Sequence, residues 1–278
     1  MPSVSVFAVG KRGYTYGAAN LSASIAHYAP DVKVNLYTDG VNLKYLKPQH
    51  VASFASIVTL DPSDYTTGDK LDPGKLKCRI ADLITDGETM YVDADSIAVK
   101  DIRPMLKALQ ADGRDYITEV IPNYLPWASE AKVQAKVGKP NAQVHPIQSS
   151  WAFIRKSKFY QTVRHVSDAG MWSLSELDHK WGKSLPDELV YTTACAMEGR
   201  NPSWRNEMLF GNKIVAKNIA EVRDQFTFMT LYGNGGGRPH VRGIYIDMYD
   251  RLLHDVFKAK LMNHSFKSNY ILNDKYLN

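Results

Sequence analysis

Short apolar runs alternate with amphipathic segments over the first 120 residues of the chain. Four runs are apolar enough, and rich enough in valine and isoleucine, to predict buried strands, at residues 3–9, 32–38, 56–60 and 89–92. Residues 15–28, rich in alanine, leucine and isoleucine, predict a helix that ends before Pro30. Strands that alternate with helices predict an α/β fold with a mostly parallel sheet covered by helices on both faces.

A second helix is predicted from Asp72 to about residue 85. Asp72 can cap the helix and Pro73 fits its first position, while Gly87 follows its end. Further strands are predicted at 115–120 and 147–155, and further helices at 186–197 and 250–260. Residues 121–143 contain several prolines and receive no assignment. The glycine-rich residues 233–237 predict either a lid over a phosphorylated ligand or a plain surface loop.

Polar residues and glycines follow the predicted strands at their carboxyl ends. Gly10, Asp39, Asp61 and Asp93 each stand at such a position. Because ligands of open parallel sheets bind beyond the carboxyl ends of the strands, we expect a binding site there.

The segment Tyr-Val-Asp-Ala-Asp that begins at Tyr91 carries the most specific chemical signal. Alternate residues of an extended chain point to the same side, so Asp93 and Asp95 are expected to converge while Ala94 faces away. Two carboxylates supply the hard oxygen ligands that Mn²⁺ or Mg²⁺ prefers, particularly when phosphates share the ion. The alternative interpretation is a polar turn that caps a strand.

Composition is that of an ordinary globular protein. The 278 residues are 44% hydrophobic and 23% charged, and two cysteines make neither a disulfide framework nor a zinc site. We find no apolar leader and no stretch that would span a membrane, which predicts a soluble, cytoplasmic protein. The net charge of +5 fits an anionic substrate without establishing nucleic-acid binding.

Taken together, the motifs resemble the GT-A glycosyltransferases, and most closely the retaining group of glycogenin and the lipopolysaccharide galactosyltransferases. The matching segments, in order along the chain, are residues 75–83, 91–102, 186–189 and 263–267. The resemblance implies a single GT-A domain over residues 1–278. Residues 1–120 would bind the nucleotide sugar, and residues 121–278 would bind the acceptor and end in a metal-binding segment. The absence of the anchor that secretory-pathway relatives carry favours a bacterial or viral origin.

The same resemblance implies a metal site made by Asp93, Asp95 and the distant His264, with Asp93 also contacting the donor ribose. An imidazole ligand favours Mn²⁺ over Mg²⁺. Lys267 would neutralise the diphosphate leaving group. For His264 and Lys267 the alternative is an ordinary surface side chain.

Other residues would bind the donor. Arg79 and Lys75 share a helix face and would contact its sugar or phosphates, or else form an exposed ion-pair stripe. Gly10, with Tyr14 or Tyr16, would bind the nucleoside, although either tyrosine could instead pack on the sheet. Asp39 would contact the base or ribose, or only close a turn.

Asp187 and Glu188 open a predicted helix, where carboxylates are also favoured by the helix dipole. The resemblance places them near the acceptor as candidate catalytic groups, together with Arg79. Three features depart from the family pattern: Glu188 stands in place of the usual glutamine, residues 148–150 read Gln-Ser-Ser in place of Asn-Ser-Gly, and the C-terminal motif lacks its glycine and Pro-Trp. The residues alone leave open whether a carboxylate base inverts the anomeric centre or whether the configuration is retained.

The leading hypothesis is a metal-dependent glycosyltransferase that moves a hexose from a UDP-sugar to a hydroxyl group. The acceptor would be a glycan or lipid-linked sugar, or alternatively a hydroxymethylated base in duplex DNA, as in bacteriophage DNA modification. A sugar-phosphate nucleotidyltransferase and a non-catalytic sugar- or DNA-binding module are the other hypotheses. The sequence predicts no oligomeric state.

Overall fold

The computed structural model describes residues 1–10, 12–68, 70–122, 125, 127–179, 185–210 and 218–230. His264, Lys267 and the segments 233–237 and 250–260 lie outside these residues, so the predictions made for them stay predictions. The described chain forms two compact units that are discontinuous in sequence. The first contains Met1–Leu60, Tyr91–Ala111 and the described residues from Glu207 onward, and the second contains Asp61–Met90 and Asp112–Asn206.

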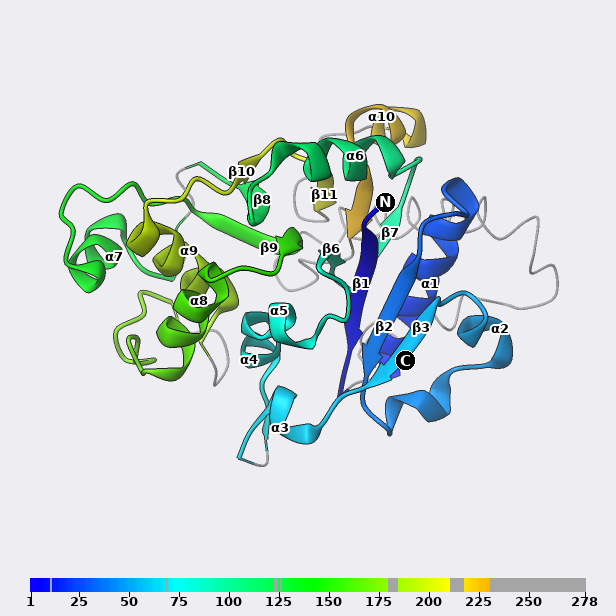
Figure 1. Cartoon of the computed structure of the whole chain (residues 1–278), viewed down its shortest axis with the longest axis horizontal. Helices are drawn as coiled ribbons and strands as arrows, with labels where there is room; N and C mark the ends of the chain where they lie inside the picture. The colour runs from blue at the N-terminus through cyan, green and yellow to red at the C-terminus, as the bar shows by residue number, and fades with distance from the viewer. Residues whose placement is uncertain are drawn as a thin grey trace. The chain divides into compact units, whose positions relative to one another are not determined.

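The first unit is built on parallel strands that the sequence predicted. Strands β1 (Ser3–Ala8), β2 (Val34–Thr38) and β3 (Ser56–Thr59) pair in parallel, side by side in Figure 1. Every residue of β1 and β2 is buried, as expected for a parallel sheet covered on both faces. The last two residues of β6 (Glu88–Val92) belong to this unit, next to β1 in the sheet.

A smaller sheet completes the strands of the first unit. Its order is β11 (Met208–Phe210), β12 (Phe228–Thr230) and β7 (Ser96–Ala98), with β7 antiparallel to β12. Helix α1 (Arg12–Tyr28) packs on β1, β2 and β7, and Ser24 Oγ accepts a hydrogen bond of 2.9 Å from the Ala98 amide. The shorter helical elements of this unit are η1 (Asn42–Tyr45), α2 (Pro48–Val51), α6 (Arg103–Asp112) and α10 (Ile219–Gln225).

The second unit contains the mixed part of the large sheet. Strand β8 (Tyr116–Val120) is antiparallel to β9 (Ile147–Arg155) and parallel to β10 (Ser203–Trp204). The first residues of β6 continue this order, so the described sheet has seven strands in the order β10-β8-β9-β6-β1-β2-β3. Thr118 pairs with Ala152 but Glu119 pairs with Gln148, which leaves residues 149–151 as a bulge in β9.

Helix α9 (Asp187–Glu198) lies at the centre of the second unit. It contacts β9, and Figure 1 shows α7 and α8 beside it. It is buried from Leu189 to Ala196 and ends at Gly199, whose φ of 66° is the left-handed conformation that suits glycine. The other elements of the unit are α3 (Pro62–Tyr65), β4 (Thr66–Thr67), β5 (Lys70–Leu71), α4 (Pro73–Cys78), α5 (Ile80–Leu83), α7 (Glu130–Val137) and α8 (Phe159–Asp168).

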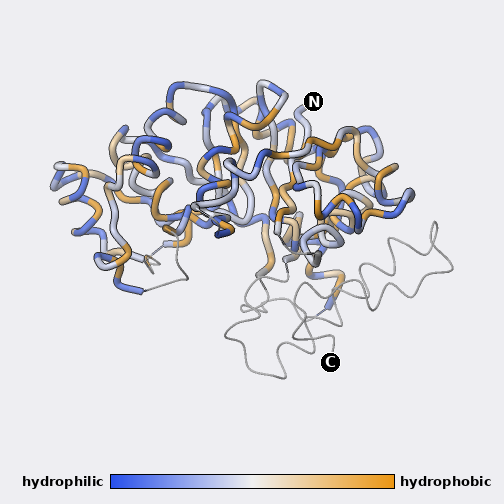
Figure 2. Tube along the Cα trace, turned by 90° about the horizontal axis from the view of Figure 1, so that it is seen from below, coloured by the Kyte–Doolittle hydropathy of each residue, from blue (hydrophilic) through white to orange (hydrophobic). Residues whose placement is uncertain are grey.

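Hydropathy along the trace accounts for this packing. Figure 2 shows hydrophobic and hydrophilic residues interleaved along the elements, as amphipathic helices and one-sided contacts require. The single helix predicted from Asp72 to about residue 85 is wrong, because the chain breaks at Arg79 into α4 and α5. Leu76 and Cys78 are buried in α4, and Ile80 and Ala81 are buried in α5.

Candidate functional site

The two carboxylates of the Asp-x-Asp motif lie in a turn between β6 and β7. The Ser96 amide donates a hydrogen bond of 3.1 Å to the Asp93 carbonyl oxygen, so the expectation of an extended backbone here is wrong. Asp93 and Asp95 are half-buried and Ala94 is buried. The turn therefore exposes part of both acidic residues and hides the residue between them.

Hydroxyl groups hold both carboxylates in place. Tyr91 donates its phenolic hydrogen to Asp93 Oδ1, and Thr230 Oγ1 donates to Asp95 Oδ1 over 3.1 Å. The Tyr91 ring packs against Phe7, with 5.8 Å between the ring centroids. These donors come from β6 and β12, which fixes the orientation of the acidic side chains before any ligand binds.

This donor set fits a divalent cation. Carboxylate oxygens are the ligands that Mg²⁺ and Mn²⁺ accept in proteins, and partial exposure leaves room for water or phosphate oxygens to complete the shell. No group of three or more histidine, cysteine, aspartate or glutamate side chains gathers as a metal site within the described residues. Asp93 and Asp95 would thus hold the ion with ligands from elsewhere, for which His264 stays a prediction.

The loop after β1 is tied down by Asp39. Its Oδ2 accepts hydrogen bonds from the Gly10 amide at 2.6 Å and from Asn42 Nδ2 at 3.0 Å, and its Oδ1 accepts one from the Asn42 amide at 2.7 Å. Asp39 is only 4% exposed, and Gly10 has a φ of 77°. Asp39 therefore fixes the ends of β1 and β2 together, and its contact with a base or ribose stays a prediction.

Tyr14 and Tyr16 lie in the first turns of α1, which begins at Arg12, three residues before the predicted start of this helix at residue 15. Both are half-buried, and the Tyr16 ring meets His50 edge-on at a centroid distance of 6.2 Å. The structure gives Tyr16 a packing contact and leaves nucleoside stacking by either ring as a prediction.

Lys75 and Arg79, the two basic residues predicted to contact the donor, both interact with other residues of the second unit. Lys75 Nζ donates to the Thr66 carbonyl oxygen over 2.7 Å, and Arg79 Nη2 lies 3.7 Å from Asp168 Oδ2. The Arg79 guanidinium Nε is buried and donates no hydrogen bond to the described residues. The structure thus connects Arg79 to the end of α8, and its role toward a donor stays a prediction.

The two acidic residues at the start of α9 have different partners. Glu188 Oε2 accepts a hydrogen bond of 3.0 Å from Trp127 Nε1. Asp187 Oδ2 lies 3.6 Å from Lys77 Nζ, and the same ammonium lies 3.4 Å from Ser149 Oγ. The sequence interpretation did not select Lys77 or Trp127, because both reach this place through contacts distant in sequence.

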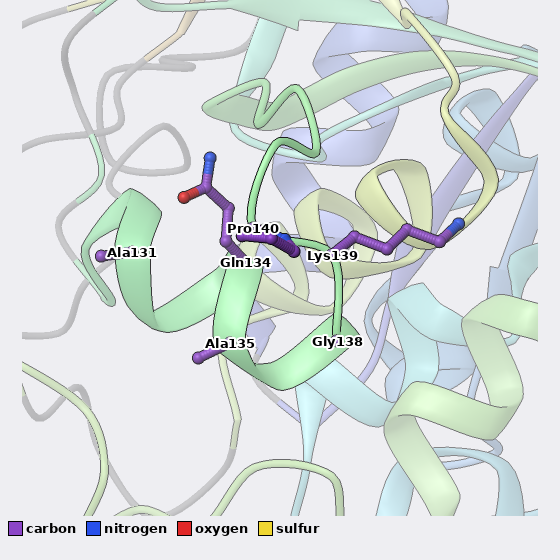
Figure 3. A pocket seen from close by; sticks show the side chains of 6 residues that line it. All are labelled: Ala131, Gln134, Ala135, Gly138, Lys139 and Pro140. Carbon is purple, nitrogen blue, oxygen red and sulfur yellow. The ribbon is translucent and has the colours of Figure 1, made fainter.

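A shallow pocket of about 370 Å³ lies at the C-terminal end of α7 (Figure 3). The side chain of Lys139 extends from its rim, and its ammonium donates to the Met197 carbonyl oxygen of α9. No predicted site residue lines it, so it plays no part in the candidate site. Its lining residues are Ala131, Gln134, Ala135, Gly138, Lys139 and Pro140.

The chain resembles known proteins in its structure but not in its sequence. No protein-family model matches the chain, and no curated protein matches it significantly. The galactosyltransferase LgtC, solved in complex with donor and acceptor sugar analogs, aligns with 96% of this chain and 99% of its own at a TM-score of 0.60 and 9% identity. The chain has the GT-A fold.

Other GT-A structures agree. The bifunctional glycosyltransferase WbbM aligns with 92% of this chain and 51% of its own at a TM-score of 0.57 and 8% identity. Mouse xyloside xylosyltransferase 1 aligns with 85% of this chain and 99% of its own at a TM-score of 0.53 and 9% identity. The fold class predicted from the sequence is thereby confirmed. Within the described part of this GT-A chain, no helix is long and apolar enough to cross a membrane.

Proposed function

We propose that the chain is a metal-dependent glycosyltransferase that moves a hexose from a UDP-sugar to a hydroxyl acceptor with retention of configuration. The observation that carries this proposal is the pair Asp93 and Asp95 at the end of β6 in a GT-A fold, each held by a hydroxyl donor. An acidic turn without a function would not require hydroxyl donors from two separate strands to orient its carboxylates. GT-A structures are known for sugar transferases, among them LgtC with donor and acceptor sugar analogs bound.

The residues of the chain would divide the work as follows. Asp93 and Asp95 hold Mn²⁺ or Mg²⁺, and a bound ion supplies positive charge to the diphosphate that leaves. Tyr91 and Thr230 keep the two carboxylates oriented, which spares reorganisation when the donor binds. Lys267 would add a second positive charge to the leaving diphosphate.

Retention is proposed from the resemblance to the glycogenin and lipopolysaccharide galactosyltransferase group. In that case the leaving diphosphate itself can take the acceptor proton, and neither Asp187 nor Glu188 need act as a general base. The contacts of these carboxylates with Lys77 and Trp127 are compatible with a role in holding the sugar. The anomeric configuration of the product, read by proton NMR coupling constants, decides between retention and inversion.

The function is tested by UDP release from a panel of UDP-sugars with Mn²⁺, each with and without hydroxymethylated duplex DNA. Mn²⁺-dependent release that DNA does not change supports transfer to a glycan or lipid-linked sugar. Release that rises only with the modified DNA keeps the donor chemistry and assigns a DNA acceptor. No release with any sugar contradicts the proposal and favours a nucleotidyltransferase or a binding module.

A further inference from the structure

The connection between β2 and β3 exposes several apolar side chains to solvent. Five large hydrophobic residues are exposed within the described chain, and three of them, Val41, Tyr45 and Val51, belong to this connection. Val41 is 61% exposed and Val51 is 43% exposed. Single exposed apolar residues are normal on a protein surface, whereas three in one short connection indicate a surface that makes a contact.

Two lysines lie one turn away from the exposed valines. The Lys44 amide donates a hydrogen bond of 3.3 Å to the Val41 carbonyl oxygen, and the Val51 amide donates one of 3.1 Å to the Lys47 carbonyl oxygen. Residues three or four apart in a helical turn lie on the same side of it, so each valine has a lysine beside it. Both lysines are exposed, and neither forms an ion pair with any residue that the structure describes.

The charge of this connection is only positive. Residues 40–60 contain no aspartate and no glutamate. The carboxylate that precedes them, Asp39, is buried and accepts hydrogen bonds from Gly10 and Asn42. The exposed side chains therefore combine apolar and cationic groups without a compensating anion, and we call them the η1–α2 patch: Val41, Lys44, Tyr45, Lys47 and Val51.

The backbone that carries the η1–α2 patch is anchored to the first unit (Figure 1). Asn42 is 1% exposed and its Nδ2 donates a hydrogen bond of 3.3 Å to the Ala8 carbonyl oxygen at the end of β1. After α2, the Ser53 carbonyl oxygen accepts a hydrogen bond of 2.6 Å from Ser22 Oγ of α1. The patch is thus preorganised, which reduces the conformational entropy lost when it binds a partner.

The composition of the patch decides which partner fits. In a twofold dimer the patch would meet its own copy, so Lys44 and Lys47 would face lysines without an acidic residue between them. The centres of protein–protein interfaces are in general depleted of lysine. Duplex DNA would attract the lysines, but its phosphate backbone offers no apolar surface on which Val41 and Val51 could be buried.

The surface of an anionic lipid bilayer satisfies both parts of the patch. Acidic headgroups attract lysine side chains, and valine side chains can enter the boundary between headgroups and acyl chains. Tyrosine is favoured at the same depth because its ring is apolar and its hydroxyl remains hydrated. The long apolar stems of Lys44 and Lys47 allow their ammonium groups to reach the headgroups while the neighbouring valines are buried.

We propose that the η1–α2 patch binds the surface of anionic lipid membranes. The inference goes beyond the proposed function and does not depend on it. The patch follows directly from the carboxyl end of β2, so binding would hold that end of the first unit at the bilayer. A lipid-linked sugar acceptor would be located at the same surface.

The test is sedimentation of the full chain with vesicles of phosphatidylcholine alone or mixed with phosphatidylglycerol. One variant, Val41→Ser/Val51→Ser, removes the apolar side chains, and another, Lys44→Gln/Lys47→Gln, removes the charges. All four positions are exposed, so the substitutions leave the core intact, and circular dichroism verifies the fold of each variant.

Two control variants change the same residue types in the second unit. Leu71→Ser removes an exposed apolar side chain, since Leu71 is 36% exposed. Lys156→Gln/Lys158→Gln removes two exposed lysines that form no ion pair with the described residues. Binding of a short labelled DNA duplex and sedimentation velocity without vesicles test the other two partners.

Wild-type protein should bind the anionic vesicles with a weak affinity, on the order of 10³–10⁴ M⁻¹ in lipid, and should not bind the neutral ones. Lys44→Gln/Lys47→Gln should weaken binding by roughly 10- to 30-fold, from the attraction expected for two lysines near an anionic surface. Val41→Ser/Val51→Ser should weaken binding by about 10-fold. Both control variants should bind as the wild type does.

The proposal is overturned if wild-type protein does not bind anionic vesicles, or if either patch variant binds them no more weakly than its control. Binding of the DNA duplex that only the lysine variant loses, without vesicle binding, would assign the patch to nucleic acid instead. A dimer that the valine variant dissociates would assign it to a second copy of the chain. UDP release is measured without vesicles, so failure of the membrane proposal and failure of the proposed function are distinct results.

Discussion

Replacing Gly74 with alanine should destabilise the protein, because the first turn of α4 lies against the chain that enters α9. A Cβ built on Gly74 would lie 2.4 Å from the Leu185 carbonyl oxygen, whereas ordinary contacts begin at 3.4 Å. The obstacle is backbone, so α4 or residue 185 must move by about 1 Å. Since Leu185 immediately precedes Pro186 and Asp187, the same approach that excludes a side chain at Gly74 brings Lys77 toward Asp187.

The magnitude follows from two opposing effects. Overpacking of this kind typically costs about 1–3 kcal/mol. Alanine regains up to about 1 kcal/mol of helix propensity over glycine, and less in a first turn. We therefore expect Gly74→Ala to lose about 1–2 kcal/mol of unfolding free energy, which corresponds to a Tm lower by roughly 2–4 °C for a chain of this size.

Gly87→Ala is the matched control. Nothing lies within 4 Å of a Cβ at Gly87, and its φ is not left-handed, so the substitution should be neutral or slightly stabilising. Urea and thermal unfolding of both variants measure the difference. A Gly74→Ala protein as stable as Gly87→Ala would refute the close approach of α4 to residue 185.

Three further predictions concern hydrogen bonds, protonation and thiols. Thr230→Val removes the hydroxyl that orients Asp95 and should raise the Mn²⁺ concentration needed for half-maximal UDP release by roughly 10- to 100-fold; Thr227→Val, which breaks a hydroxyl–carboxylate bond to Glu207 elsewhere in the same unit, should lower stability without that shift. Burial lowers the pKa of His145 below its ordinary 6.5, so the unfolded chain binds a proton more readily than the folded chain, and stability falls as pH drops through 6.5. In His145→Gln the urea concentration at the unfolding midpoint should therefore change less between pH 7.5 and 5.5 than it does in the wild type. An equal change in the two proteins would contradict this. Burial raises the pKa of both the Cys78 and the Cys195 thiols, so Ellman's reagent at pH 8 should label neither until urea unfolds the chain, and rapid labelling of folded protein would show that one is accessible.

Local pattern was sufficient for the elements that are uniformly buried or clearly capped. The strand predicted at residues 3–9 matches β1 because it is a short apolar run, and the strand predicted at 147–155 matches β9 although it carries the small polar residues Gln148, Ser149 and Ser150. Asp72 caps α4 as predicted, with its side chain accepting a hydrogen bond from the Lys75 amide. Helix α7 was missed because the prolines around it obscured an eight-residue amphipathic segment.

The contacts that shape the candidate site could not be predicted in this way. Asp95 was selected from its motif, but its hydroxyl partner Thr230 lies 135 residues away in the chain. The Ser149 hydroxyl is 72 residues from the ammonium of Lys77, and only the bulge in β9 presents it. A bulge depends on the pairing register of two strands, so a single sequence does not reveal which side chains it brings forward.

The most direct test of the account is UDP release with Mn²⁺ by wild-type protein, Asp95→Ala and Asp101→Ala. Asp101 pairs with Arg103 on the surface of the same unit, so its variant controls for the loss of an acidic residue a few positions away. The account predicts that Asp95→Ala abolishes Mn²⁺-dependent release from the preferred UDP-sugar while Asp101→Ala keeps it. Equal release by both variants, with both proteins folded, would contradict a metal site at the end of β6.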